Sequence, residues 1–137
     1  MRRTLKKAWL ALAFAMSPQC FAYPYPQAFE NLIDDFAVCA TFYNFMYAQA
    51  VSAKWEKEQG QMLAARDTAT TWVHELMKDK PSGWEASKLE VNHKLMMAEY
   101  ERSGVEGLYL AHSDTCKLVM NDYKSRLQYW LDKPSRP

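Results

Sequence analysis

Apolar residues recur along most of the chain at the spacing of amphipathic helices. Over residues 27–58, one series repeats every seven positions and a second series lies four positions further on; together they comprise Leu32, Phe36, Cys39, Tyr43, Met46, Ala50 and Ala53. The pattern predicts a first helix over 27–58 that is buried on more than half of its circumference. No segment of useful length alternates with the period of two that a half-buried strand shows.

Two further segments continue this periodicity. A second helix is expected over 61–78, after Gly60, which is either a joint or a kink. A third is expected over 82–102, where Ser82 and Glu85 have the spacing of a capping box. This third helix is apolar on two faces, so it is either sandwiched or presents one face to a partner. The second of those faces holds Trp84, Val91, Leu95 and Ala98.

The last helical pattern covers 113–133, with Ser113 or Asp114 as its expected cap. It follows a loose joint around Gly104, and residues 134–137 are expected to form a disordered tail. The alternating Tyr and Pro residues of 23–26 predict an extended lead-in. The sequence therefore predicts an all-α domain over 23–133, a four-helix antiparallel bundle.

The first 22 residues differ from the rest in composition. Four basic residues precede the apolar run 8–16, and small residues at Cys20 and Ala22 occupy the −3 and −1 positions of a cut before Tyr23. The run is too short to cross a bilayer. We therefore predict a cleaved signal peptide over 1–22 and a mature protein that is periplasmic or secreted.

The predicted mature chain has the size of one domain and a weakly acidic balance. Its 115 residues carry 13 Lys and Arg against 16 Asp and Glu, a net charge of about −3. That balance argues against nucleic acid, which selects a basic patch, and against docking on anionic lipid. We expect no stable membrane anchor after cleavage of the signal peptide.

Cys39 and Cys116 are the two cysteines of the predicted mature chain. In an exported protein an even pair predicts one disulfide, with two free thiols as the alternative. A bridge requires Cα atoms within about 7 Å, so it would place the first helix beside the last. His112 precedes Cys116 by one helical turn and is expected to lie near the bridge.

Aromatic residues are in excess, with sixteen Phe, Trp and Tyr in the predicted mature chain. Several crowd two turns of the first helix, so they belong either to the core or to an exposed patch that binds a partner. Large aromatic side chains dominate the energetics of interfaces. The predicted contact residues are Phe42, Tyr47, Trp55 and Trp84.

The pattern His-x-Leu-Met occurs at His74 and again at His93. Imidazole and thioether are ligands of copper and of haem, so His93, Met96 and Met46 are the candidate ligands of a carrier site between helices. The periodicity places His74 on a solvated face and His93 on the core face, which weakens a site shared by both. Gap-filling methionines explain the pattern without any ligand, and no cofactor is expected.

No arrangement of residues in the sequence indicates a catalytic site. His112, Ser113 and Asp114 are adjacent in sequence and cannot take up the relative geometry of a triad. Asp34 and Asp35 are also adjacent and point to different faces of a helix. We therefore expect a non-enzymatic exported protein that binds another protein, as an inhibitor, immunity-like factor, adaptor or chaperone does. The alternative is a carrier of haem, copper or a small molecule.

Overall fold

A computed structural model describes residues 23–134, and the expected signal peptide over 1–22 lies outside them. Helices α1 (Tyr25–Ser52), α2 (Glu56–Met77), α3 (Trp84–Asn121) and α4 (Tyr123–Asp132) follow one another, and no strand occurs within this range. The all-α prediction is confirmed. No helix in the described range has the length and apolar character needed to traverse a bilayer.

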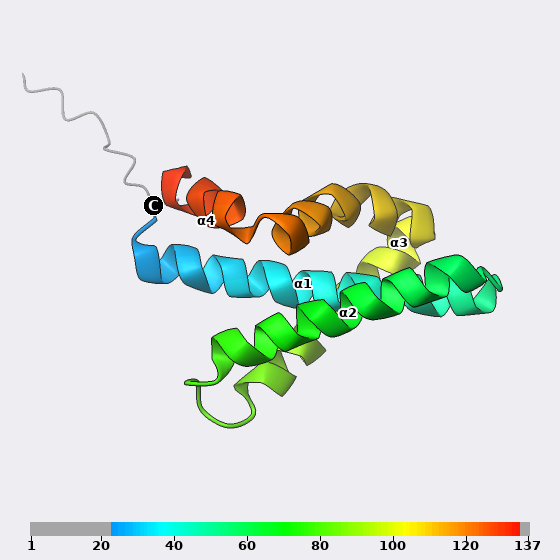
Figure 1. The fold of residues 1–137 in the computed structure, drawn as a ribbon, viewed down its shortest axis with the longest axis horizontal. Helices are drawn as coiled ribbons and strands as arrows, with labels where there is room; N and C mark the ends of the chain where they lie inside the picture. The colour runs from blue at the N-terminus through cyan, green and yellow to red at the C-terminus, as the bar shows by residue number, and fades with distance from the viewer. Residues whose placement is uncertain (1–22, 135–137) are drawn as a thin grey trace, which may run out of the picture.

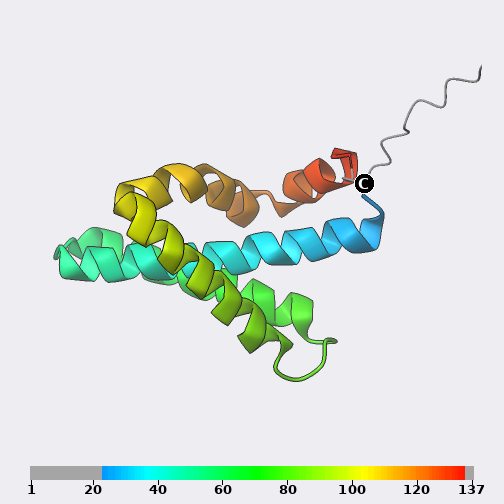
Figure 2. The same ribbon diagram turned by 180° about the vertical axis from the view of Figure 1, so that it is seen from behind.

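Helix α1 is the centre of the molecule and contacts each of the other three helices. Helix α2 runs back along it, and α3 then bends sharply at Gly104 (Figure 1). The bend divides α3 into a first arm, residues 84–103, and a second arm, residues 105–121. The second arm returns along α1, and α4 continues in the same direction (Figure 2). The chain therefore reverses direction after α1, after α2 and at Gly104, and the first arm of α3 crosses α1 obliquely (Figure 2).

The first two helices are divided at a place that the sequence does not mark. The break lies at residues 53–55 and not at Gly60, which is inside α2. Lys54 has a φ of 58°, and the Trp55 N–H donates to the carbonyl of Ala50. The predicted boundary at Glu58 is wrong because a lysine in the left-handed region carries no compositional signal.

The third and fourth expected helices have different boundaries from those predicted. Helix α3 continues to Asn121, so Cys116 lies near its end, and buried Ser113 is inside it and is not a cap. The cap of α4 is Asp122, whose carboxylate accepts from the Ser125 N–H at 3.2 Å. The chain is helical again directly after the kink at Gly104, so no separate loop precedes residue 113.

Two expectations at helix starts are also wrong. Gly83, with a φ of 90°, is the N-cap of α3, and no side chain caps this helix. Glu85 binds the ring of His74 at 3.0 Å and does not complete a capping box with Ser82. Helix α1 already includes Pro26, because a proline is tolerated in the first turn, where its missing N–H has no helical partner.

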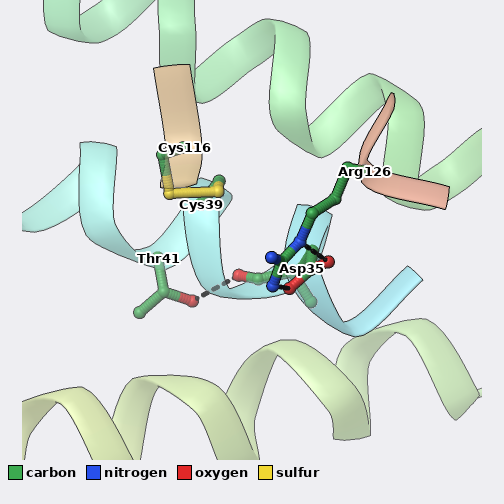
Figure 3. Close-up of a disulfide and its surroundings, with 6 residues drawn as sticks. Asp35, Cys39, Thr41, Cys116 and Arg126 are labelled. Carbon is green, nitrogen blue, oxygen red and sulfur yellow. Dashed lines mark hydrogen bonds and ion pairs between the residues drawn. A yellow bond between two sulfur atoms is a disulfide. The ribbon is translucent and has the colours of Figure 1, made fainter. Parts of the chain in front are cut away.

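The core is built on α1, whose buried side chains meet those of α2 and of both arms of α3. The largest fully buried side chains are Phe36, Phe42, Leu32, Ile33, Leu108, Val73 and Val119. The predicted disulfide is present between Cys39 and Cys116, with a Cα–Cα distance of 5.4 Å (Figure 3). It joins α1 to the second arm of α3 in the middle of this core.

Acidic residues of α1 hold three other segments by ion pairs. Glu30 pairs with Lys80 before α3, and Asp34 pairs with Lys88 on the first arm. Asp35 pairs with Arg126 on α4. Adjacent Asp34 and Asp35 therefore do face different ways, as their spacing predicts, and each bonds to a different element.

Candidate binding surfaces

The four aromatic residues predicted to contact a partner have different surroundings. Phe42 is 2% exposed and is a core residue, so its selection as a contact residue is wrong. Tyr47 is half-buried beneath Arg66, whose guanidinium lies 5.4 Å from the ring centroid. Trp55 and Trp84 are 51% and 50% exposed, and each lines a separate cavity.

The first cavity is a groove beside the first arm of α3, here called the α3 groove. Its volume is about 550 Å³. Trp84, Val91 and Leu95 give it an apolar wall, and their spacings of seven and four residues place them along one face of the helix. Val91 and Leu95 are 53% and 65% exposed. This is the second apolar face that the sequence predicts for the third helix.

Three polar side chains that line the α3 groove, Asp34, Lys88 and Asn92, are already bonded within the protein. The ammonium of Lys88 pairs with the carboxylate of Asp34 on α1. The side-chain N–H of Asn92 donates to the backbone carbonyl of Lys88 at 2.9 Å. Burial of the aliphatic and indole surface would therefore contribute most of the favourable free energy when the groove is covered.

The second cavity lies where α1 turns into α2 and is here called the corner cleft. Its volume is about 390 Å³. Met46 of α1, Met62 of α2 and Tyr109 of the second arm line it together with Trp55. Its charged lining residues are Glu58 and Glu106, and Gln49, Ala50 and Val105 complete its wall.

The three candidate metal or haem ligands are in different surroundings. His93 is exposed and its ring packs 5.3 Å from that of Phe45, so its predicted place on the core face is wrong. Met96 is 3% exposed in the core, and Met46 lines the corner cleft. Within residues 23–134 no three His, Cys, Asp or Glu side chains are grouped as a metal site requires. Their placement gives a shared copper or haem site no support.

His74 and His112 each bond to one carboxylate. His74 is exposed, as predicted, and bonds to Glu85. His112 bonds to Glu99 at 2.9 Å, and its ring lies 5.9 Å from that of Phe42. The His112–Glu99 pair joins the two arms of α3 across the kink. His112 is therefore a packed side chain of the bend.

The residues of the corner cleft were not selected from the sequence, apart from Met46 and Trp55. The cleft is assembled from α1, α2 and the second arm, so its residues share no spacing along the chain. Only the break at residues 53–55 exposes Trp55 at the corner, and no local pattern predicts that break.

Comparisons of this chain with protein-family models, curated proteins and solved structures find no match.

Proposed function

We propose that this chain is an exported protein that acts by binding an amphipathic helix of another protein in the α3 groove. The observation that supports this most directly is the exposed apolar face formed by Trp84, Val91 and Leu95. Its spacing is that of a helix-packing seam, and an apolar helix laid along the groove would cover it. A buried indole is also a common anchor of protein interfaces.

The export part of the proposal is supported by two features. The first is the composition of residues 1–22, which is that of a signal peptide. The second is the disulfide, because such bonds persist mainly in oxidising compartments. Intact mass and N-terminal sequencing of the exported protein test this directly. A mature chain starting at Tyr23 is expected, and an uncleaved chain in the cytoplasm would contradict it.

Two leucines on α3 offer a matched pair of variants for testing the groove. Leu95 is 65% exposed within the groove, and Leu110 is 75% exposed on the second arm, outside it. A photo-reactive residue in place of Val91 is used to cross-link partners in the native host. We expect Leu95→Asp to abolish the adduct and Leu110→Asp to preserve it, with the cross-link mapping to an amphipathic helix.

Other outcomes of the same experiment count against the proposal. Equal loss of the adduct in both variants would indicate a general effect of the new charge. An adduct with a second copy of this chain, together with a dimer in light scattering, would assign the α3 groove to self-association. Circular dichroism of both variants verifies that each keeps the helical fold.

A second candidate function is carriage of a small molecule. The corner cleft favours it, because its volume of about 390 Å³ lies within the usual range for such sites and its lining is mainly apolar. Copper and haem carriage lack a comparable observation. The two functions use separate surfaces, so variants of one surface leave the other intact.

A further inference from the structure

Trp55 differs from the other tryptophans of the described residues in having no ring or cation beside it. Trp84 has the ammonium of Lys80 at 5.5 Å from its ring centroid, and Trp130 has Arg126 at 4.9 Å. Trp72 stacks on Phe36. Within residues 23–134 no aromatic ring, Lys or Arg stands over the indole of Trp55.

Hydrogen bonds at the break between α1 and α2 fix the backbone of Trp55. The Trp55 N–H donates to Ala50 at 2.9 Å, and the Gln59 side chain donates to the same carbonyl at 3.3 Å. These bonds attach the corner to the last turns of α1. The indole extends from this anchored backbone to line the corner cleft, and half of its surface remains exposed.

The charges of the corner cleft have one sign. Glu58 comes from α2 and Glu106 from the second arm of α3, and both line the cleft. Neither carboxylate forms an ion pair with any residue in the range 23–134. No Lys or Arg lines the cleft, and Lys117, which lies over the Tyr109 ring at 5.7 Å, is outside its lining.

The remaining lining suits an apolar body of modest size. Met46 and Met62 bring polarisable thioethers from α1 and α2 to the cleft. Unbranched methionine side chains adapt to ligands of different shape and pack well against aromatic groups. A bare indole face beside two carboxylates is the combination that attracts an organic cation, because the ring quadrupole and the carboxylates attract the same charge.

We propose that the corner cleft binds a small organic cation, an amine or quaternary ammonium that carries a compact apolar group. The cationic head lies over Trp55 and between Glu58 and Glu106, and the apolar group packs on the two methionines. A cleft of about 390 Å³ is large enough to hold a molecule of this size. This inference develops the second candidate function and does not depend on the α3 groove.

Three probes that share a benzyl group test the proposal on the full mature protein: benzyltrimethylammonium, its neutral carbon analogue neopentylbenzene, and the anion phenylmethanesulfonate. Binding is followed by calorimetry and by the chemical shift of the Trp55 indole proton. We expect saturable binding of the cation about tenfold or more tighter than of the neutral analogue, and no binding of the anion.

Variants with matched controls assign the binding to this cleft. We expect Trp55→Ala, and the double variant Glu58→Gln with Glu106→Gln, each to weaken binding of the cation about tenfold. Trp84→Ala removes an equally exposed indole on the α3 groove, and Glu75→Gln removes an exposed carboxylate elsewhere on α2. Both controls are expected to bind the cation as the wild type does.

Several results would overturn the proposal. They are absence of saturable binding of the cation, equal affinity for the neutral analogue, and equal weakening by Trp84→Ala. A dimer of the wild type that dissociates in Trp55→Ala would assign the cleft to a second copy of the chain. Failure of the protein-binding test at Leu95 has no bearing on these measurements, so the two proposals fail separately.

Discussion

The carboxylate of Asp35 on α1 is held by Arg126 on α4, 91 residues later in the chain. Its two oxygens lie 2.7 Å from Nε and 3.0 Å from Nη2 of the guanidinium (Figure 3), and Trp130 Nε1 donates to it at 2.6 Å. The Arg126 and Asp35 side chains are 15% and 12% exposed. Burial lowers the pKa of Arg126, but the hydrogen bonds and charges of Asp35 and Tyr129 together outweigh burial and raise it, so the guanidinium keeps its charge.

Asp35→Asn is expected to destabilise the protein by about 2 kcal/mol, because it leaves a poorly hydrated guanidinium without its counter-ion. The free energy of unfolding is measured by urea denaturation. The control is Glu90→Gln, which breaks the exposed ion pair of Glu90 with Lys94 and is expected to leave the midpoint unchanged. An equal loss in both variants would show that the buried pair has no special role.

The disulfide is expected to raise the free energy of unfolding by about 4–5 kcal/mol, because it closes a long loop in the unfolded chain. The residues it joins are 77 apart and each is 1% exposed. The double variant Cys39→Ala, Cys116→Ala should show this loss in urea denaturation, and a reductant should cause no further loss in it. Reaction of a thiol reagent with both Cys39 and Cys116 of the native protein would contradict the bridge.

Two glycines are expected to respond to alanine in opposite directions. Gly60 is inside α2, and a Cβ there would meet nothing within 4 Å, so Gly60→Ala should stabilise the protein by about 1 kcal/mol. Gly104 has a φ of 70° and a ψ of −175°, a backbone region almost restricted to glycine. Gly104→Ala should therefore lower the midpoint of thermal unfolding. A higher midpoint in this variant would show that the kink does not require glycine.

Periodicity and the two cysteines predict a large part of the fold. The apolar series around Phe36 marks the buried face of α1, and the pairing of Cys39 with Cys116 places the C-terminal half beside it. Both inferences succeed because a helix of α1's length must bury its apolar face and because a disulfide demands close Cα atoms.

The boundaries of the helices could not be predicted in the same way. Lys54 adopts a positive φ although lysine has no preference for that region, so tertiary packing and not composition decides the break. Gly60 was an equally plausible joint by composition, yet it remains helical because its neighbours in α2 pack on α1. Local sequence thus predicts that a break occurs, and the packing determines where.

The two candidate surfaces also differ in how far the sequence predicts them. Trp84, Val91 and Leu95 lie on one helix, so their spacing alone predicts a shared apolar face. Glu106 and Met62 reach the corner cleft from different helices, and only the folded chain brings them together. Phe42 was predicted to contact a partner but is buried in the core. The helix that carries it has several apolar faces, and the sequence does not indicate which of them the other helices cover.

The Asp122 cap of α4 gives the protein a stability term that depends on pH. Hydrogen bonds from the Ser125 hydroxyl at 2.6 Å and its backbone N–H hold the pKa of Asp122 below its usual 3.8. A carboxylate with a lowered pKa in the folded state stabilises the fold fully above 3.8, and this stabilisation is lost as the pH falls through the lower folded value. Asp122→Ala should therefore be destabilising at neutral pH, and its difference from the wild type should shrink as the pH falls below 3.8. Urea denaturation at several pH values measures this difference, with exposed Asp114→Ala as the control that should show no such trend. A difference that is constant with pH would mean that the cap acts without its charge.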